Sequence, residues 1–313
     1  MSFANAKTKN QKKALVTGAS GFLGANLVKK LLDEDYEVYA VSRKQPVDIE
    51  HPLLHRITCD VANSTEFEKR LPGEGLKECL FFHLAWTDTS GPGRADYATQ
   101  LSNVKTTCDL VKFAARSSCK RFIYASSINE METYEYLQSD DVEPGGGYIY
   151  GTAKLPAHLM GEVVAYQEGI EFIPVIITNI YGAGEKSARM INTAVRKLLN
   201  GEHCSFTAGN QMYDFVYLTD AINSIYEVAT KGKPFTRYYI GSGNPKPLKE
   251  FLFQMRDAVA PDAELGLGDI PFRGKSIDYS QFDLQKVEND TGYKNAVTFE
   301  EGIRLTAQAV RAE

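Results

Sequence analysis

A glycine-rich segment near the start of the chain most constrains its fold. Residues 17–24 read TGASGFLG and directly follow a short apolar run at residues 14–16. Beyond Phe22, apolar residues recur at helical spacing as far as Leu32. The glycines therefore lie where a strand turns into a helix, and the unpaired N–H groups and positive dipole end of such a helix favour an anion. The segment predicts a site for the phosphates of a nucleotide.

Gly18, Gly21 and Gly24 are spaced three apart, and each has its own steric task. Gly18 permits backbone angles that a side chain would forbid, Gly21 lets the main chain approach a pyrophosphate, and Gly24 lets the helix pack closely on the strand. A glycine-rich surface turn without a ligand is the alternative interpretation. We expect the other residues of the turn to line the same site: Ser20, Phe22 and Leu23.

The size and charge of the chain narrow its class. With 313 residues, 43% of them hydrophobic, it is long enough for one large domain or for a domain with a smaller lobe. The net charge of −5 is small and the basic residues are scattered, so nucleic acid is not an expected partner. No apolar stretch approaches the roughly 18–20 residues of a membrane span, and the lysine-rich start lacks the apolar region of a signal peptide. We therefore expect neither secretion nor membrane insertion.

The cysteines and histidines indicate a reduced protein without a metal site. The five cysteines are odd in number and lack CxxC spacing, which favours buried thiols and a cytoplasmic location. His51 and His55 are four residues apart, but Pro52 between them argues against a helix that would present both to a metal ion.

Strand-like and helix-like segments alternate through the first half of the chain. Amphipathic stretches predict helices at Tyr97–Arg116 and 150–167. This alternation is typical of an α/β fold in which crossover helices flank a doubly wound parallel sheet, and we assign residues 1–180 to a Rossmann-type domain. Apolar runs predict its strands at Lys13–Thr17, Glu37–Ser42, 55–59, Leu80–His83, 121–126 and Glu171–Ile177.

Beyond residue 180 the pattern changes to glycine-rich turns and shorter elements. We predict a helix at 187–199 and short strands at Cys204–Phe206 and 237–240. Residues 181–313 are assigned mainly to a smaller substrate-binding lobe, with later segments returning to the sheet. Because ligands of doubly wound sheets bind beyond the carboxyl ends of the strands, such a lobe would close a substrate cleft.

The end of the second predicted strand indicates which dinucleotide is bound. About 20 residues beyond the glycines, an Asp or Glu would hold the ribose hydroxyl of NAD. This chain has Ser42, Arg43 and Lys44 there, and a hydroxyl beside two cations suits a 2′-phosphate. We therefore predict NADP in preference to NAD; the alternative is that Arg43 and Lys44 are solvated loop charges.

Tyr150 and Lys154 form a Tyr-x-x-x-Lys pair on a predicted helix. Their side chains share one face of that helix, about 6 Å apart along its axis. Tyrosine has an ordinary pKa of about 10 and carries protons poorly at neutral pH. A nearby ammonium favours the phenolate and lowers that pKa, which makes Tyr150 a usable general acid or base. Tyr148 is a competing tyrosine, although the residue four positions further on is Thr152.

The glycine turn and the Tyr-x-x-x-Lys pair together resemble the short-chain dehydrogenase/reductase family, in its extended branch of nucleotide-sugar epimerases and dehydratases. The resemblance implies that Tyr150 and Lys154 are catalytic and contact the cofactor. Ser127, at the end of the fifth predicted strand, aligns with the family's catalytic Ser or Thr, where its hydroxyl would bind the reacting oxygen. Ser126 is the alternative for that position.

Further cofactor contacts follow from the same resemblance. Trp86 departs from the small residue that the family usually has after its HLA segment, and we place Trp86 at the substrate side of the cleft. For two of these contacts another interpretation is open: Asp60 could only form a turn, and Asn103 could only bond a neighbouring carbonyl. The expected cofactor contacts are Asp60, Val61, Leu84, Ala85 and Asn103.

The second half of the chain is similar to nucleotide-sugar enzymes in three segments, TNIYGAG at 178–184, DFVYLTD at 214–220 and YIGSG at 239–243. By this resemblance Asn179 contacts the substrate. Two arginines of the family pattern are replaced by Tyr213 and Ile176, which removes cations that would hold a diphosphate. Arg189 and Arg273 are the candidates to compensate, with surface charge as the alternative. The expected substrate contacts are Trp86, Ser127, Asn179, Arg189, Tyr213 and Arg273.

The two residues after Ser127 reduce the number of reactions that we expect this chain to catalyse. Sugar 4,6-dehydratases of this type carry Asp-Glu there, because elimination of water needs an extra acid and base. This chain has Ile128 and Asn129, so we do not expect a 4,6-dehydratase. The predicted function is NADPH-dependent reduction of a ketone on a nucleotide-linked 4-keto-deoxysugar. Alternatives are a nucleotide-sugar 4-epimerase, a reductase of small aldehydes or ketones, and a non-catalytic dinucleotide-sensing protein. The resemblance also implies a homodimer that pairs the helices Tyr97–Arg116 and 150–167.

Overall fold

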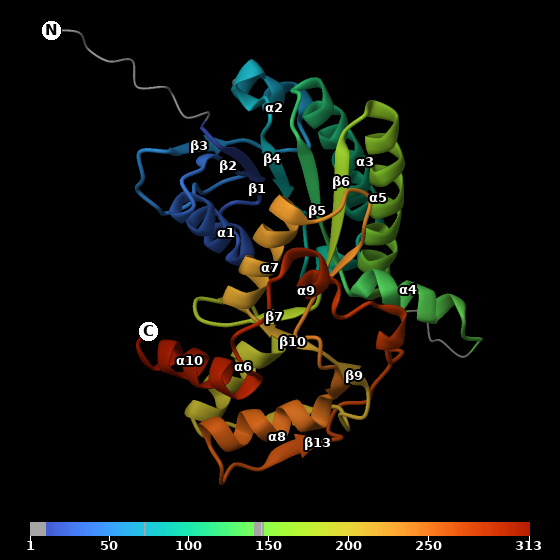
Figure 1. Cartoon of the computed structure of the whole chain (residues 1–313). Helices are drawn as coiled ribbons and strands as arrows, with labels where there is room; N and C mark the ends of the chain where they lie inside the picture. Colours follow the sequence, from blue (N-terminus) through green and yellow to red (C-terminus); the bar gives the residue numbers. More distant parts are fainter. Residues whose placement is uncertain (1–10, 72, 141–144, 146) are drawn as a thin grey trace, which may run out of the picture.

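Seven parallel strands form the central sheet of the computed structural model, which describes residues 11–71, 73–140, 145 and 147–313. Residues 1–10, the polar start of the chain, lie outside the described residues. The order across the sheet is β3-β2-β1-β4-β5-β6-β11, and each neighbouring pair is parallel (Figure 1). The strands are β1 (Lys13–Thr17), β2 (Glu37–Ser42), β3 (Leu54–Thr58), β4 (Leu80–His83), β5 (Arg121–Ser127), β6 (Glu171–Ile177) and β11 (Tyr238–Ile240).

The strand order reverses direction between β1 and β4, which makes this point the switch point of a doubly wound sheet. The chain runs outward from β1 to β3 and then returns to place β4 on the other side of β1. The carboxyl ends of β1 and β4 therefore diverge into crossovers on opposite faces, leaving a crevice where a ligand binds.

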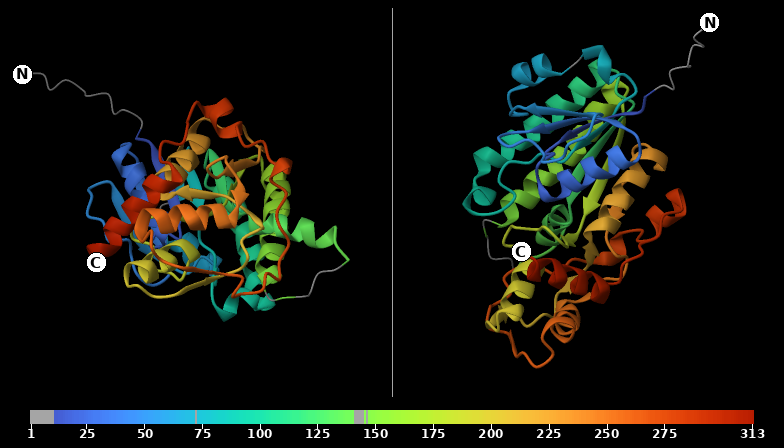
Figure 2. Two further views of the ribbon diagram at one scale, coloured as in Figure 1. Left: turned by 90° about the horizontal axis from the view of Figure 1, so that it is seen from below. Right: turned by 90° about the vertical axis from the view of Figure 1, so that its left-hand side faces the viewer.

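Helices cover both faces of the sheet (Figures 1 and 2). One face packs on α1 (Phe22–Asp33) and α7 (Leu218–Lys231), which bury aliphatic side chains against β1, β2 and β5. The opposite face packs on α2 (Ser64–Arg70), α3 (Tyr97–Arg116) and α5 (Gly147–Glu168), with a core rich in phenylalanine. These two cores confirm the predicted α/β class.

A smaller lobe lies at the carboxyl ends of the strands, at the bottom of Figure 1. Its core joins α6, α8 and α10 around Phe215 and Phe251. A short helix, α4 (Asn129–Leu137), leads from β5 toward this lobe. The remaining elements are β7 (Asn179–Tyr181), α6 (Met190–Leu199), β8 (Cys204–Phe206), β9 (Met212–Tyr213), β10 (Phe215–Tyr217), β12 (Lys246–Pro247), α8 (Leu248–Val259), β13 (Leu265–Leu267), α9 (Lys286–Thr291), α10 (Phe299–Arg311) and the 3-10 helices η1 (Gly73–Leu76), η2 (Pro92–Ala95) and η3 (Tyr279–Gln281).

Two buried aspartates tie the lobe to the sheet. The Asp214 carboxylate accepts hydrogen bonds from the Tyr239 and Ser242 hydroxyls and, at 3.2 Å, from the Gly243 N–H. The Asp220 carboxylate accepts from the Tyr293 hydroxyl at 2.7 Å and from two backbone N–H groups of the C-terminal segment. Because buried carboxylates are costly unless they are hydrogen-bonded, these contacts fix the lobe over the crevice.

The predicted elements agree with the structure apart from their ends. β3 begins and ends one residue earlier than the predicted strand, α5 begins at Gly147, and α6 begins at Met190. The helix α4 was not predicted, since its apolar residues are few. No helix among the described residues is long and apolar enough to cross a membrane.

Candidate active site

A cleft of about 450 Å³ opens at the switch point of the sheet. It brings together residues that are far apart in the sequence, from the ends of β1 to β6 and from α1, α4 and α5. Most of the predicted cofactor residues line it, as do all three predicted catalytic residues. Its lining includes Gly18, Ser20, Gly21, Phe22, Leu23, Gly24, Ser42, Arg43, Asp60, Val61, Leu84, Ala85, Trp86, Ser127, Tyr150, Lys154, Asn179 and Arg189.

Neighbouring backbone atoms lie so close to Gly18 and Gly24 that neither position has room for a side chain. Gly18 has a φ of +73°, and a Cβ there would lie 2.8 Å from the Ala85 nitrogen. A Cβ on Gly24 would lie 2.1 Å from the Gly18 oxygen. Gly21 caps α1 without any side-chain hydrogen bond, so the first N–H groups of α1 are left for a ligand. The turn therefore has the form that a phosphate site requires.

The end of β2 presents a buried hydroxyl and an exposed cation to the same cleft. Ser42 is 2% exposed, and its Oγ has no hydrogen-bond partner among the described residues. The Arg43 guanidinium is exposed and donates to the Thr87 hydroxyl at 3.3 Å. A buried hydroxyl without a partner is costly, and a ligand oxygen would satisfy it.

Two of the predicted cofactor residues also have structural tasks. Asp60 is exposed, and its Oδ1 accepts a hydrogen bond from the Ala62 N–H at 3.0 Å, as in an ordinary turn. The amide of Asn103 bonds both the N–H and the carbonyl of Thr87, each at 3.0 Å. Asn103 lines a separate cavity of about 220 Å³ beside the cleft, together with Asp60. Asn103 therefore shapes the cleft wall through Thr87.

Ser127, Tyr150 and Lys154 converge in the middle of the cleft. β5 ends with Ser127, and α5 carries the other two residues on one face, as their spacing predicts. The Ser127 hydroxyl hydrogen-bonds the hydroxyl of Tyr150. The Arg94 guanidinium stacks on the Tyr150 ring, 4.0 Å from its centroid. Tyr150 thus has a hydrogen-bond partner at its hydroxyl and a cation over its ring.

Burial raises the pKa of Tyr150, and the Ser127 hydrogen bond and the charge of Arg94 oppose this rise. The Lys154 Nζ lies 5.9 Å from the Tyr150 ring centroid. The sequence-based expectation that the Lys154 ammonium lowers the pKa of Tyr150 therefore stays a prediction. In this structure Nζ is held by the Ala125 carbonyl and lies over the Trp86 ring.

Lys154 is itself desolvated. Its Nζ donates to the Ala125 carbonyl oxygen at 2.8 Å and lies 3.6 Å from the centroid of the Trp86 ring. Trp86 is fixed in turn by a 2.7 Å hydrogen bond from its Nε1 to Gln100. Burial lowers the pKa of Lys154 to about 7, with the charge of Glu130 acting in the opposite direction.

This lowered pKa predicts a pH-dependent contribution to stability. Unfolded Lys154 regains an ordinary pKa of 10.5, so between about pH 7 and about pH 10 the unfolded chain binds more protons than the folded chain. The free energy of unfolding of the wild type should therefore rise with pH, relative to that of Lys154→Met, from about pH 7 to about pH 9. Urea unfolding of both proteins at each pH measures this difference. Both proteins have the same cysteines, so the contribution of cysteine titration to the free energy of unfolding cancels in the comparison. A constant difference would show that Lys154 keeps its ordinary pKa in the folded protein.

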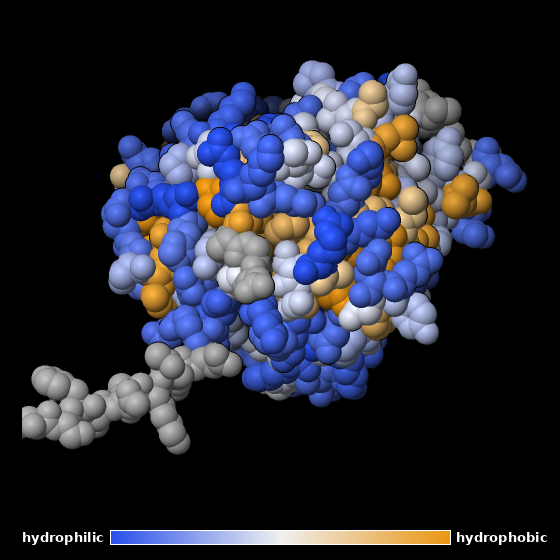
Figure 3. All heavy atoms as spheres, turned by 90° about the horizontal axis from the view of Figure 1, so that it is seen from above, coloured by the Kyte–Doolittle hydropathy of each residue, from blue (hydrophilic) through white to orange (hydrophobic). Residues whose placement is uncertain are grey.

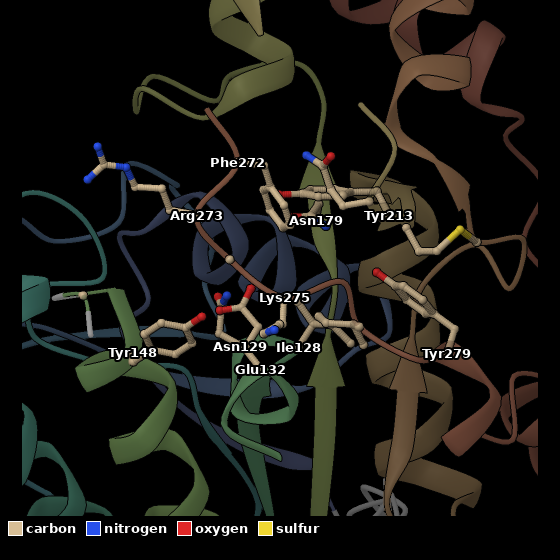
Figure 4. A pocket seen from close by; sticks show the side chains of 15 residues that line it. Ile128, Asn129, Glu132, Tyr148, Asn179, Tyr213, Phe272, Arg273, Lys275 and Tyr279 are labelled. Atoms are coloured by element: carbon tan, nitrogen blue, oxygen red, sulfur yellow. The ribbon is translucent and has the colours of Figure 1, made fainter. Parts of the chain in front are cut away.

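A second cavity of about 320 Å³ adjoins the cleft on the side of the lobe (Figure 4). Ile128, Asn129 and Asn179 line both spaces, so the two communicate. Tyr213 and Arg273, predicted substrate contacts, line this second cavity, whereas Arg189 lines the cleft. Arg189 is exposed and lies 3.4 Å from the Glu185 carboxylate. The structure thus divides the predicted substrate residues between two connected spaces.

Sequence reasoning missed two residues of this site, Arg94 and Glu132. Arg94 follows a Gly-Pro-Gly loop, and its guanidinium reaches both Tyr150 and, at 3.1 Å, the Asn129 side chain. Glu132 lies one turn further along α4 and lines the second cavity. A charged residue in a loop between β4 and α3 carries no periodic signal, so only the three-dimensional structure locates Arg94.

The described residues contain no group of three His, Cys, Asp or Glu side chains placed to hold a metal ion. His55 instead lies 2.9 Å from Glu37, and His51 accepts a hydrogen bond from the Leu53 N–H at 3.2 Å. These contacts account for the two histidines whose spacing was considered in the sequence.

A doubly wound sheet with a glycine turn at its switch point and a Tyr-x-x-x-Lys pair beside it defines a dinucleotide-dependent enzyme of the extended short-chain dehydrogenase/reductase type. The chain belongs to the NAD dependent epimerase/dehydratase family, which it matches over residues 14–241.

Three known proteins illustrate what this chain is similar to. CDP-abequose synthase of Salmonella muenchen is 24% identical over 85% of this chain and 87% of its own length. UDP-glucose 4-epimerase of Thermotoga maritima, solved with UDP-glucose, has a TM-score of 0.77 and 20% identity, covering 96% of this chain and 99% of its own. The enzyme WbmF of Bordetella bronchiseptica, solved with NAD⁺ and UDP, has a TM-score of 0.77 and 20% identity, covering 96% and 93%.

Proposed function

We propose that this protein is a cytosolic, NADPH-dependent reductase of a ketone on a nucleotide-linked 4-keto-deoxysugar. The observation that carries the proposal is the place of Ser127, Tyr150 and Lys154, where a dinucleotide-sized cleft meets a second, separately lined cavity. A cofactor in the cleft and a sugar in the second cavity would meet at this set of residues.

Each residue of the set has a separate task in ketone reduction. NADPH, when bound, supplies the hydride. Tyr150 donates its proton to the ketone oxygen, and Ser127 hydrogen-bonds that oxygen as negative charge develops on it. Lys154 binds the hydroxyls of the nicotinamide ribose. Arg94, stacked on the Tyr150 ring, stabilises the phenolate that remains after proton transfer.

The preference for NADP is supported by the end of β2. Ser42 offers an unpartnered hydroxyl and Arg43 an exposed guanidinium to the cleft, and neither is a carboxylate that would repel a 2′-phosphate. The similar structures named above include one solved with NAD⁺, so the preference rests on these two residues alone.

Arg43→Ala tests the cofactor assignment. The change should raise the dissociation constant of NADPH by about 10- to 100-fold, since a charge-assisted hydrogen bond to phosphate contributes about 1.5–3 kcal/mol. The dissociation constant of NADH should stay within about twofold of the wild-type value. Isothermal titration with both nucleotides measures this, with Arg304→Ala, an exposed arginine of α10, as the matched control. Equal weakening of both nucleotides would remove the basis for NADP.

A third cavity along the same row supports a nucleotide as part of the substrate. This cavity of about 300 Å³ is lined by Phe206, Leu248 and Ile270 and adjoins the second cavity through Gln211, Tyr213 and Phe272. The row of spaces can hold a reacting sugar near Tyr150 and a flat, partly apolar base further into the lobe. Arg273 and Lys275 line the second cavity and bring positive charge to a diphosphate bound there.

Turnover with defined substrates tests the function. The protein is incubated with NADPH and the CDP, dTDP, GDP and UDP forms of 4-keto-6-deoxyglucose, and NADPH oxidation is followed. Stoichiometric oxidation with one nucleotide form supports the proposal. Conversion of a nucleotide sugar at carbon 4 without net oxidation or reduction of cofactor would select the 4-epimerase instead. Tight dinucleotide binding with no ketone reduced would select a sensing protein.

We also propose a homodimer formed through α3 and α5. These neighbouring helices expose large apolar side chains, among them Tyr97 at 69% and Tyr166 at 75%. Leu101, Met160 and Val163 are more than half exposed on the same two helices. Figure 3 shows apolar side chains gathered on the side of the molecule that carries α3 and α5. Such patches mark interfaces, and sedimentation velocity should show a species of twice the chain mass.

A further inference from the structure

Glu132 places a carboxyl group in the second cavity. It lies three residues after Asn129 on α4, so the two side chains share one face of that helix. Figure 4 shows the Glu132 carboxyl beside Asn129 in the middle of the cavity, with the Tyr148 hydroxyl pointing toward it. Tyr213 and Tyr279 line the far side. A ligand in this cavity would therefore contact Glu132 directly.

Hydrogen bonds connect this carboxyl to the catalytic pair. Asn129 hydrogen-bonds the Glu132 carboxyl, and its Oδ1 accepts from the Ser127 hydroxyl at 3.2 Å and from the Arg94 guanidinium at 3.1 Å. Ser127 in turn hydrogen-bonds Tyr150. One polar chain thus runs from the substrate cavity to the proposed proton donor.

The surroundings of Glu132 raise the pKa of its carboxyl group above the ordinary value. Burial raises the pKa of Glu132, while the Asn129 hydrogen bond and the charge of Arg94 oppose the rise. The other titratable groups that line the cavity are Tyr148, Tyr213, Tyr279, Lys275 and Arg273. Burial also raises the pKa of the first three, with the charge of Glu132 adding to the effect, so they stay neutral.

Reduction of a ketone uses one proton donor, and Tyr150 already supplies it. The carboxyl group of Glu132, which faces the substrate cavity, is therefore unused by the proposed reaction. The carbons next to a ketone carry the most acidic C–H bonds of a keto sugar, and a positioned carboxylate is a suitable base for them.

Resting on the proposed ketone reduction, we infer that Glu132 is a second acid–base residue, which removes a proton from the carbon beside the ketone. The electron pair of the broken C–H bond forms the C=C bond of an enolate, and the negative charge moves to the ketone oxygen at Ser127. Glu132 becomes a neutral carboxylic acid and returns a proton to the same carbon. No electrons pass to or from the cofactor in this step.

Exchange with heavy water separates this step from reduction. The full-length protein is incubated in D₂O with NADP⁺, which supplies no hydride, and the four nucleotide forms of 4-keto-6-deoxyglucose. Mass spectrometry and NMR then locate deuterium beside the ketone, with an enzyme-free sample as background. NADPH-dependent reduction of the same compounds is measured in parallel.

The wild type should incorporate deuterium at one carbon beside the ketone, and Glu132→Gln should do so about 100-fold more slowly. Glu132→Asp should recover part of the exchange, which a purely structural role would not predict. Glu135→Gln is the matched control: it lies on α4 outside the cavity and contacts Asp278 and Gln281. It should exchange at the wild-type rate.

Two outcomes would overturn the inference. Reduction without deuterium incorporation by the wild type would leave the proposed function standing and remove the role of Glu132. Exchange that survives unchanged in Glu132→Gln would do the same. Absence of both reduction and exchange with all four nucleotide forms would instead overturn the proposed function, together with the inference that rests on it.

Discussion

Tyr150→Phe should lower the rate of ketone reduction by about 100- to 10,000-fold, the usual contribution of a positioned general acid. The change removes only the hydroxyl that hydrogen-bonds Ser127, while the ring keeps its contacts with Arg94 and, at 6.0 Å between ring centroids, with Trp86. NADPH binding should therefore change little. Steady-state turnover and an independent titration with NADPH measure the two effects separately.

Tyr148→Phe is the informative comparison for that variant. Tyr148 competes with Tyr150 in the sequence, and its hydroxyl is buried without a hydrogen-bond partner among the described residues. It lines the second cavity and not the cleft, so its loss should affect KM more than kcat. A larger loss of kcat in Tyr148→Phe than in Tyr150→Phe would reverse the assignment of the proton donor.

Gly24→Ala should weaken NADPH binding about 100-fold, equivalent to a loss of about 3 kcal/mol. The new Cβ would lie 2.1 Å from the Gly18 oxygen and 2.9 Å from the Ala19 Cα, both backbone atoms that cannot swing aside. The start of α1 must then move away from the turn, and the N–H groups that face the phosphates move with it. The free energy of unfolding should also fall, by about 1–3 kcal/mol.

Isothermal titration and urea unfolding check these two effects. Gly145→Ala is the control, because a Cβ at Gly145 meets nothing within 4 Å. Gly21→Ala is a milder variant of the same turn, with its Cβ 3.3 Å from the Gly18 oxygen, and remains informative if Gly24→Ala does not fold. Wild-type affinity for NADPH in both turn variants would show that the turn holds no phosphate.

The fold and the catalytic pair could be predicted because each has a local signal. A strand, a three-glycine turn and an amphipathic helix follow one another within 20 residues, and the spacing of Tyr150 and Lys154 fixes their common face. The alternation of later segments predicted the parallel sheet, and the structure confirms it.

The parts that could not be predicted depend on contacts between distant segments. Arg94 reaches Tyr150 across the cleft from a separate loop, and no pattern near residue 94 indicates this. The Lys154 Nζ contacts Trp86 and the Ala125 carbonyl, which come from other parts of the chain, so spacing along α5 could not predict these contacts. Glu132 lies on α4, a helix with few apolar residues that the sequence did not predict, so no local pattern places its side chain in the second cavity.

Trp86 is the only tryptophan in the sequence, and it lies against both Lys154 and Tyr150. All tryptophan emission from this protein therefore originates beside the catalytic pair. Because the Lys154 ammonium lies over the indole face, any movement of that cation or arrival of a ligand changes the local field on the indole. The chain thus carries an intrinsic optical reporter of its active site, which allows binding to be followed without a label.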